Sequence, residues 1–232
     1  MKVVWNADDR IAIFDKYTYG FEWRFNGEDG ASAGTFTQVP NEDFVTGNIL
    51  DYVYAVYPYA EDIPISNSGV LTLTLPATQS YKAGSFGPSV NTMVSVTENN
   101  NLAFKNLGGF LMLKLYGSGI TVKTITLAGN KNEKIAGKAS VEMPVGGTPS
   151  VTMAPTATET VTLNCGSVAL GSTAGDYVGF WLVLPPTDFS EGFTITVTDA
   201  LNGTFVKKAT RHIDLLRNQL IHMEPLEVTP TY

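Results

Sequence analysis

Hydrophobic and polar residues alternate along most of this chain, as they do in β-strands that bury one face. In the segment FTITVT, Phe193, Ile195 and Val197 lie on one face and threonines lie on the other. Similar segments, such as VLTLTLP and VKTITLAG, recur between turn-forming residues. Many short strands separated by turns are typical of β-sandwiches. The pattern therefore predicts an all-β protein.

Two segments are apolar at nearly every position, FLMLKLY at residues 110–116, which Lys114 interrupts, and YVGFWLVLPP at residues 177–186. A strand without alternation is expected where both faces of a sheet are covered. Trp181 lies within the second segment, so we expect its side chain to be buried. A helix is expected at one place at most, in NEDFVTGNILDYV at residues 41–53, where Asn41 could cap the first turn.

The length of 232 residues is enough for one large all-β domain or two domains of ordinary size. The stretch TENNN at residues 97–101 follows an expected strand and is polar and turn-forming. We therefore predict two β-sandwich domains in tandem, over residues 1–98 and 99–232.

The balance of charge argues against some classes of partner. Charged residues make up 16 % of the chain and the net charge is −7 at pH 7, with an isoelectric point near 4.8. An acidic chain repels phosphate backbones and anionic lipid headgroups. Lys207 and Lys208 are adjacent bases, but a pair is too small for a nucleic-acid-binding patch. We expect no nucleic-acid partner.

The residue types that most often carry catalysis or bind metals are few and isolated in this sequence. Cys165 is the one cysteine, which excludes an intramolecular disulfide, and it lies in phase with Val161 and Leu163, which predicts a buried thiol. His212 and His222 lie outside the spacings that bring two imidazoles to one zinc ion. We expect no catalytic residue, no cofactor and no metal ion, and therefore no enzyme.

Adjacent carboxylates leave one enzymatic alternative open, a hydrolase of the sandwich type, because glycoside hydrolysis needs two acids at a suitable separation. Such pairs occur in ADDR, GEDG and AEDI, at residues 8–9, 28–29 and 61–62. All three lie in expected loops, where acids are ordinarily solvated. Asn202-Gly203-Thr204 matches the acceptor sequence for N-glycosylation, but Asn-Gly between two strands also predicts a hairpin turn.

The segment YVYAVYPY at residues 52–59 holds four tyrosines, and two interpretations compete for it. Tyrosines on one face would form a stacking platform for sugars, whereas tyrosines on both faces would pack in a core. Alternation places Tyr52 and Tyr54 on one face and Tyr57 on the other. We therefore expect a strand that packs in the core and at its rim.

Six longer phrases occur in a fixed order along the chain. They are WNADDRIAIF near the start, YAVYPY at 54–59, LPATQSY at 75–81, FKNLGGFLMLKLYG at 104–117, ITLAG at 125–129 and RNQLI at 217–221. Together they resemble, over nearly the whole chain, the fimbrillin-like family, the type V pilins on the surface of Gram-negative gut and oral anaerobes.

This resemblance implies two transthyretin-like β-sandwiches, export as a lipoprotein, proteolytic trimming of an N-terminal strand, and assembly into fimbriae by β-strand addition. On that basis we expect a non-enzymatic fimbrial subunit or fimbria-associated protein at the cell surface, in the outer membrane or the fimbrium. Its partners would be other fimbrial subunits and a glycan or protein on a host or bacterial surface. The alternative is a tip adhesin or another glycan-binding module that does not polymerise. The start, MKVVWNADDR, has no signal-peptide pattern, which by itself fits either a cytoplasmic protein or a mature fragment. The resemblance implies that a leader, a lipidated cysteine and a first strand precede Met1.

The last residues, LEVTPTY at 226–232, alternate as a strand does. Leu226, Val228, Pro230 and Tyr232 fall on one face, which suits an apolar groove, and they are the candidate donor strand. One interpretation is that the tail completes an edge of its own sandwich, where Pro230 is tolerated. The other, which the family resemblance suggests, is that the tail is donated to the next subunit and fills a groove left by the removed N-terminal strand.

Overall fold

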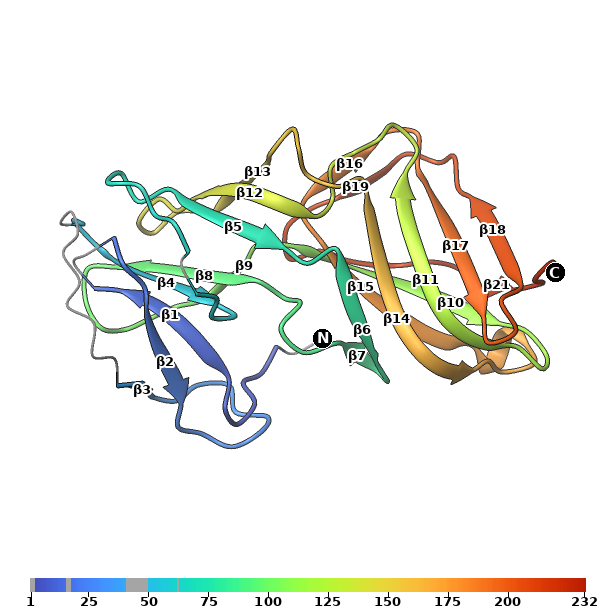
Figure 1. Ribbon diagram of the computed structural model, residues 1–232, viewed down its shortest axis with the longest axis horizontal. Coiled ribbons are helices and arrows are strands. Elements are labelled where there is room, and N and C mark those ends of the chain that lie inside the picture. Colours follow the sequence, from blue (N-terminus) through green and yellow to red (C-terminus); the bar gives the residue numbers. More distant parts are fainter. Residues whose placement is uncertain (1–2, 16–17, 41–49, 62) are drawn as a thin grey trace. The chain divides into compact units, whose positions relative to one another are not determined.

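The structure is a computed structural model that describes residues 3–15, 18–40, 50–61 and 63–232. These residues form β-strands joined by turns and loops, with a short 3₁₀ turn, η1 (Ala174–Asp176) (Figure 1). The prediction of an all-β protein is confirmed. The helix expected over residues 41–53 falls largely outside the described residues, and Val53 begins a strand. No helix within the described ranges is long and apolar enough to cross a membrane.

Contacts between backbone segments divide the chain into two compact units. Unit 1 consists of Met1–Leu73, Thr92–Asn106 and Ser140–Thr152, and unit 2 consists of Thr74–Asn91, Leu107–Ala139 and Met153–Tyr232. The two units therefore interleave in sequence. The domain boundary expected after residue 98 lies inside a segment of unit 1, so it does not coincide with this division, and independent folding of either part stays a prediction.

The main sheet of unit 1 has the strand order β3-β2-β1-β4-β8-β9, with antiparallel neighbours. Its strands are β1 (Arg10–Phe14), β2 (Phe21–Phe25), β3 (Phe36–Gln38), β4 (Val53–Tyr57), β8 (Met93–Thr97) and β9 (Lys105–Asn106). The tyrosine-rich segment forms the central strand β4, in which Tyr54 and Tyr57 are 5 % and 7 % exposed. This burial confirms that the segment packs in the core and does not form a stacking platform.

A second sheet has the order β13-β12-β5. Its strands are β5 (Leu71–Leu75), β12 (Gly137–Glu142) and β13 (Ser150–Met153). Each of these strands contributes residues to both units, because the divisions at residues 73, 139 and 152 fall within them. In β5 the leucines are buried while the threonines between them are partly or fully exposed, as the alternation predicts.

Unit 2 is a sandwich of two sheets whose inner faces share one core. One sheet has the order β15-β10-β20, with β21 also paired to β10, and the other has the order β18-β17-β11-β14-β6-β7. The strands are β6 (Thr78–Lys82), β7 (Ser85–Phe86), β10 (Gly109–Tyr116), β11 (Thr121–Gly129), β14 (Thr160–Ala169), β15 (Val178–Leu184), β17 (Phe193–Asp199), β18 (Thr204–Lys208), β20 (Leu220–His222) and β21 (Leu226–Glu227). A separate pair joins β16 (Thr187–Phe189) to β19 (Ile213–Leu215).

Residues from both sheets of unit 2 form a continuous apolar core. Leu113 of β10 and Phe180 of β15 pack with Ile125, Leu163 and Val197 of the opposite sheet, all at 2 % exposure or less. The strands β10 and β15 come from the two largely apolar segments and are buried along most of their length, with Lys114 of β10 partly exposed. Both faces are therefore covered, as their sequences predict.

A glutamine side chain, not a strand, closes part of the outer edge of β15. Gln79 lies in β6 of the other sheet and is 2 % exposed. Its Nε2 donates to the Val183 carbonyl oxygen at 2.6 Å, and its Oε1 accepts from the Val183 amide at 3.0 Å. The carboxamide thus satisfies one donor and one acceptor that a neighbouring strand would otherwise take, on an edge that would be open to pairing with another chain.

Candidate functional site

The C-terminal tail packs on unit 2 of its own chain in the structure, at the warm-coloured end in Figure 1. Leu226 pairs with Leu115 in the parallel contact between β21 and β10, and the Val228 amide donates to the Tyr116 carbonyl at 2.8 Å. Val228 is 2 % exposed and belongs to the core of unit 2. These contacts are those of a strand that completes its own sandwich, and donation of the tail to another chain stays a prediction.

Beyond Val228 the tail changes partner from β10 to β18. Thr231 and Thr204 exchange two backbone hydrogen bonds of 2.9 Å. The Tyr232 hydroxyl donates to Asp199 Oδ2 at 2.8 Å, and this bond is the main reason that the pKa of Tyr232 is raised. Tyr232 is 80 % exposed although Val228 is buried, so the face shared by the four candidate donor residues is not buried throughout. The change of partner explains the difference, because regular pairing with β10 ends at Glu227.

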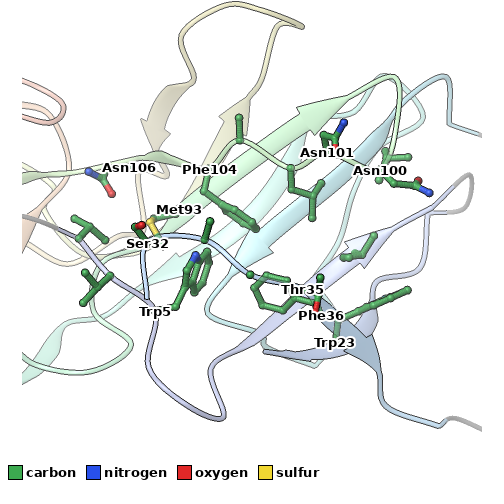
Figure 2. A pocket seen from close by; sticks show the side chains of 18 of the residues that line it. Trp5, Trp23, Ser32, Thr35, Phe36, Met93, Asn100, Asn101, Phe104 and Asn106 are labelled. Atoms are coloured by element: carbon green, nitrogen blue, oxygen red, sulfur yellow. The ribbon is translucent and has the colours of Figure 1, made fainter. Parts of the chain in front are cut away.

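Unit 1 contains a cavity of about 750 Å³, which we call the aromatic hollow (Figure 2). Its floor is one face of the main sheet, where Ile13, Val53 and Met93 project from β1, β4 and β8. Three further segments, residues 3–5, 32–36 and 100–104, complete its lining together with Asp15, Trp23 and Asn106. Its rings come from parts of the sequence far apart: Trp5, Trp23, Phe36 and Phe104.

Trp5 holds the aromatic lining together. The rings around it are those of Phe25, Phe36, Tyr57 and Phe104, with centroids 5.2–5.8 Å from that of Trp5. Most of these contacts are edge-to-face, the arrangement that the ring quadrupoles favour. Figure 2 shows Trp5 and Phe104 together, with Thr35 and Phe36 nearby. The rings of Trp5, Phe36 and Phe104 are therefore held in place by their own packing.

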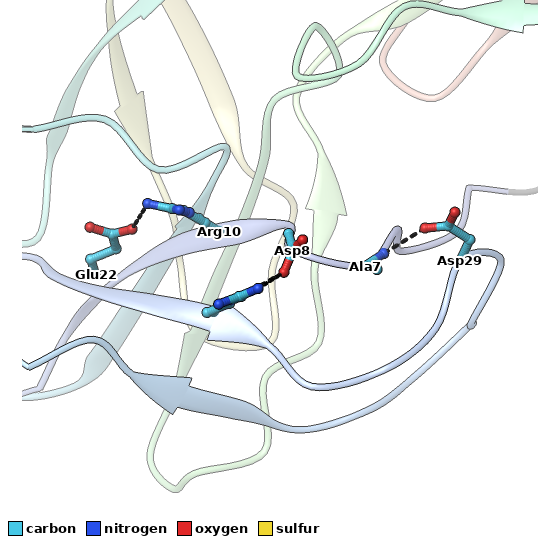
Figure 3. A network of polar contacts seen from close by, with 6 residues as sticks. Ala7, Asp8, Arg10, Glu22 and Asp29 are labelled. Atoms are coloured by element: carbon cyan, nitrogen blue, oxygen red, sulfur yellow. Dashed lines mark hydrogen bonds and ion pairs between the residues drawn. The ribbon is translucent and has the colours of Figure 1, made fainter.

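Polar contacts fix the chain that follows Trp5 (Figure 3). The Ala7 amide donates to Asp29 Oδ1 at 2.7 Å, and the Asn6 amide donates to Asp9 Oδ2 at 2.8 Å. Asp8 pairs with Arg24 of β2. Asp8, Asp9 and Asp29 thus bind a guanidinium group or backbone amides, which gives these three acids structural partners.

The rim of the hollow carries neutral polar groups. Ser32 and Thr35 lie in the segment before β3, and Asn100 and Asn101 lie in the loop before β9. All four residues are exposed. Asp15 is the one ionisable side chain among the described lining residues. Hydroxyl and amide groups can donate and accept hydrogen bonds without a net charge.

Within the described residues, no three His, Cys, Asp or Glu side chains are grouped so that they could hold a metal ion. His212 Nε2 is 2.7 Å from Asp188 Oδ1 in an exposed pair. The ring of His222 packs edge-on against Trp181, with centroids 5.9 Å apart. Asn202 has a positive φ of 64° in the turn between β17 and β18, as the Asn-Gly hairpin predicts.

Cys165 is buried in the core of unit 2, as its phase in the sequence predicts, with 8 % exposure. Burial raises the pKa of its thiol to about 12. The thiolate is the reactive form, so we expect the folded protein to resist a thiol-specific chromogenic reagent at pH 8. One thiol should react promptly once denaturant is added. Rapid labelling without denaturant would mean that this part of the core opens readily.

Comparison with known proteins gives the fold a context. No family model matches the chain, and no curated protein sequence matches it. A crystal structure described as a "putative cell adhesion protein from Bacteroides ovatus ATCC 8483" is similar, with a TM-score of 0.55 and 16 % identity over 96 % of this chain and 83 % of that chain. Another, a "putative cell adhesion protein from Bacteroides uniformis ATCC 8492", has a TM-score of 0.54 and 15 % identity over 97 % and 88 % of the two chains. At these identities the likeness concerns architecture, and this chain shares the fold of both proteins.

Proposed function

We propose that the protein is a non-enzymatic adhesion protein of the cell surface, of the fimbrillin-like kind. The observation that carries this proposal is the likeness in fold, over 96 % and 97 % of the chain, to two proteins described as cell adhesion proteins. The ordered phrases that resemble fimbrillin-like sequences point in the same direction. Placement in the outer membrane or a fimbrium, and anchoring by a lipid, are parts of the same proposal.

We propose further that chains assemble by β-strand addition through the tail of residues 226–232. The tail supports this idea because it lies at an edge of unit 2 and still supplies the core residue Val228. The tail contacts β10 and β18, which are distant from it in the sequence. The shortest of these separations is the 27 residues between Thr204 and Thr231. The tail of a second copy could make the same contacts, so exchange would preserve the core of each subunit.

A pair of cysteines can report which chain supplies the tail. Thr204 and Thr231 are exposed partners in an antiparallel bridge, at a separation that suits a disulfide. We expect the Thr204→Cys, Thr231→Cys double variant, refolded at high concentration and mildly oxidised, to give covalent dimers and higher oligomers. Chains carrying one substitution each, mixed in denaturant and refolded together, should give cross-linked heterodimers. Non-reducing electrophoresis with mass spectrometry measures both.

The matched control is the Thr198→Cys, Thr204→Cys variant. Thr198 and Thr204 are partners within the hairpin of β17 and β18, so their disulfide forms within one chain regardless of assembly. Assembly by tail exchange is rejected if two results are obtained together. The double variant at positions 204 and 231 would give only monomeric product, as the control does, and the mixed single variants would give no heterodimer. The tail would then stay on its own chain.

A second candidate function is an adhesive module that does not polymerise. The aromatic hollow favours it, because a cavity with fixed rings and a neutral polar rim is a feature of ligand-binding sites and strand exchange through the tail does not need one.

A further inference from the structure

The aromatic hollow of unit 1 has the composition of a binding site for an uncharged, hydroxyl-rich ligand. Trp5, Trp23 and Phe36 line the hollow with partly exposed rings, which can contact apolar C–H groups, and the exposed residues Asn100 and Asn101 carry amides. We propose that the hollow binds a neutral carbohydrate. The proposal rests on the surface-adhesion function above and assigns that function a site.

Charge argues against an anionic ligand. The described lining contains no lysine, arginine or histidine, and its one ionisable side chain is the acid Asp15. Phosphate, sulfate and carboxylate groups are recognised chiefly by cations and by clustered backbone amides. A sialylated, sulfated or phosphorylated sugar would therefore meet repulsion at the rim, whereas a neutral sugar would not.

The backbone of the floor argues against a peptide strand as the occupant. The floor residues Ile13, Val53 and Met93 come from strands that each lie between two hydrogen-bonded neighbours in the order β2-β1-β4-β8-β9. Ile13 pairs with Phe21 and Ala55, and Met93 pairs with Tyr57 and Asn106, so the main chain of these two residues is paired on both sides. A strand laid on this face would find no ladder to extend and would bury its own amides without partners, which is costly. A carbohydrate has no such requirement.

The size and rigidity of the hollow suit a short saccharide. Its volume of about 750 Å³ lies within the roughly 300–1,000 Å³ typical of small-ligand sites. The ring cluster around Trp5 and the hydrogen bonds of Asp9 and Asp29 to the following backbone preset the wall. A preset wall lowers the ordering cost of binding, which matters for sugars because their individual contacts are weak.

Tryptophan fluorescence provides a direct readout, because two of the three tryptophans, Trp5 and Trp23, line the hollow. The full-length protein would be titrated with neutral trisaccharides of glucose, mannose, galactose and xylose, and with sialyllactose as the acidic counterpart, followed by calorimetry. We expect at least one neutral trisaccharide to bind and sialyllactose to bind much more weakly. Trp23→Ala should reduce the affinity about tenfold or more, equivalent to 1.4 kcal/mol.

Asn101→Ala is a second variant with less risk to folding, because Asn101 is exposed and its backbone bond to Asn99 Oδ1 is retained. It should also weaken the neutral sugar severalfold. Tyr177→Ala is the matched aromatic control, because Tyr177 is 38 % exposed but lies in unit 2, whereas the hollow lies in unit 1. This variant should bind the neutral sugar with the affinity of the wild type.

Three outcomes would overturn the proposal. One is that no neutral trisaccharide changes the fluorescence or heat at millimolar concentration. Another is that Trp23→Ala and Asn101→Ala, both folded by circular dichroism, bind as well as the wild type. The third is that a synthetic peptide of residues 226–232 occupies the hollow, quenching its tryptophans in the wild type but not in Trp23→Ala. The cysteine experiment tests assembly through the tail and does not involve the hollow. Failure of the tail proposal can therefore be distinguished from failure of the carbohydrate proposal.

Discussion

Replacing Gln79 by alanine is expected to lower the free energy of unfolding by about 2–4 kcal/mol. The substitution leaves the amide and the carbonyl of Val183 without their partners in a place where Gln79 and Val183 are 2 % and 6 % exposed. A buried polar group that loses its partner costs about 1–3 kcal/mol, more than the net value of the bond itself. Equilibrium unfolding in urea measures the effect.

The control for this prediction is Gln219→Ala. The Oε1 atom of Gln219 also accepts a backbone hydrogen bond, from Leu216 at 2.8 Å, but this contact is exposed and water can replace it. Its loss should cost well under about 1 kcal/mol. We also expect Gln79→Ala to increase self-association, because it uncovers an edge of β15. Equal stability of the two variants would mean that water or a backbone shift satisfies Val183.

Trp181→Ala is expected to destabilise the protein by about 3–5 kcal/mol, the usual range for truncation of a large buried aromatic residue. Trp181 is 9 % exposed and its ring packs against His222. Its strand neighbour Phe180, on the other face of β15, is fully buried in the core of unit 2. Phe180→Ala should have an effect of similar size, because both faces of this strand are covered.

Tyr177→Ala is the control for both variants. Tyr177 precedes the same strand but is 38 % exposed and contacts Lys114 through its ring face. Thermal and urea unfolding should show a small change for this variant. A loss below about 1 kcal/mol for Trp181→Ala would place its side chain at the surface and would point to a second aromatic binding face.

The local structure was largely predictable because period-two alternation depends on neighbouring residues alone. Phe193, Ile195 and Val197 are buried and the threonines between them are partly exposed, as the FTITVT pattern predicts. Features that join distant residues carry no such signal. Gln79 lies in LPATQSY, where nothing distinguishes it from a solvated polar residue, and its partner Val183 is 104 residues away.

The aromatic hollow and the division into two units could not be predicted from the sequence, for related reasons. The aromatic lining combines Trp5, Phe36 and Phe104, which no short motif links. Turn-forming stretches such as TENNN mark loops within a unit as well as joints between domains, so composition alone placed the boundary inside unit 1. In the tail, alternation correctly identified Val228 as an inward residue but could not reveal the change of strand partner before Tyr232.

The interleaved units have a consequence for how the chain can fold as it emerges from the ribosome or an export channel. Unit 1 needs the segment Ser140–Thr152, and unit 2 begins at Thr74 and needs the chain to its end. The first 73 residues therefore cannot complete their unit until roughly twice as many have emerged. Strands whose partners arrive late fold slowly and expose unpaired edges in the meantime. We infer that folding follows release of the chain instead of proceeding unit by unit from the N-terminus, so a holding chaperone should raise the yield of native protein.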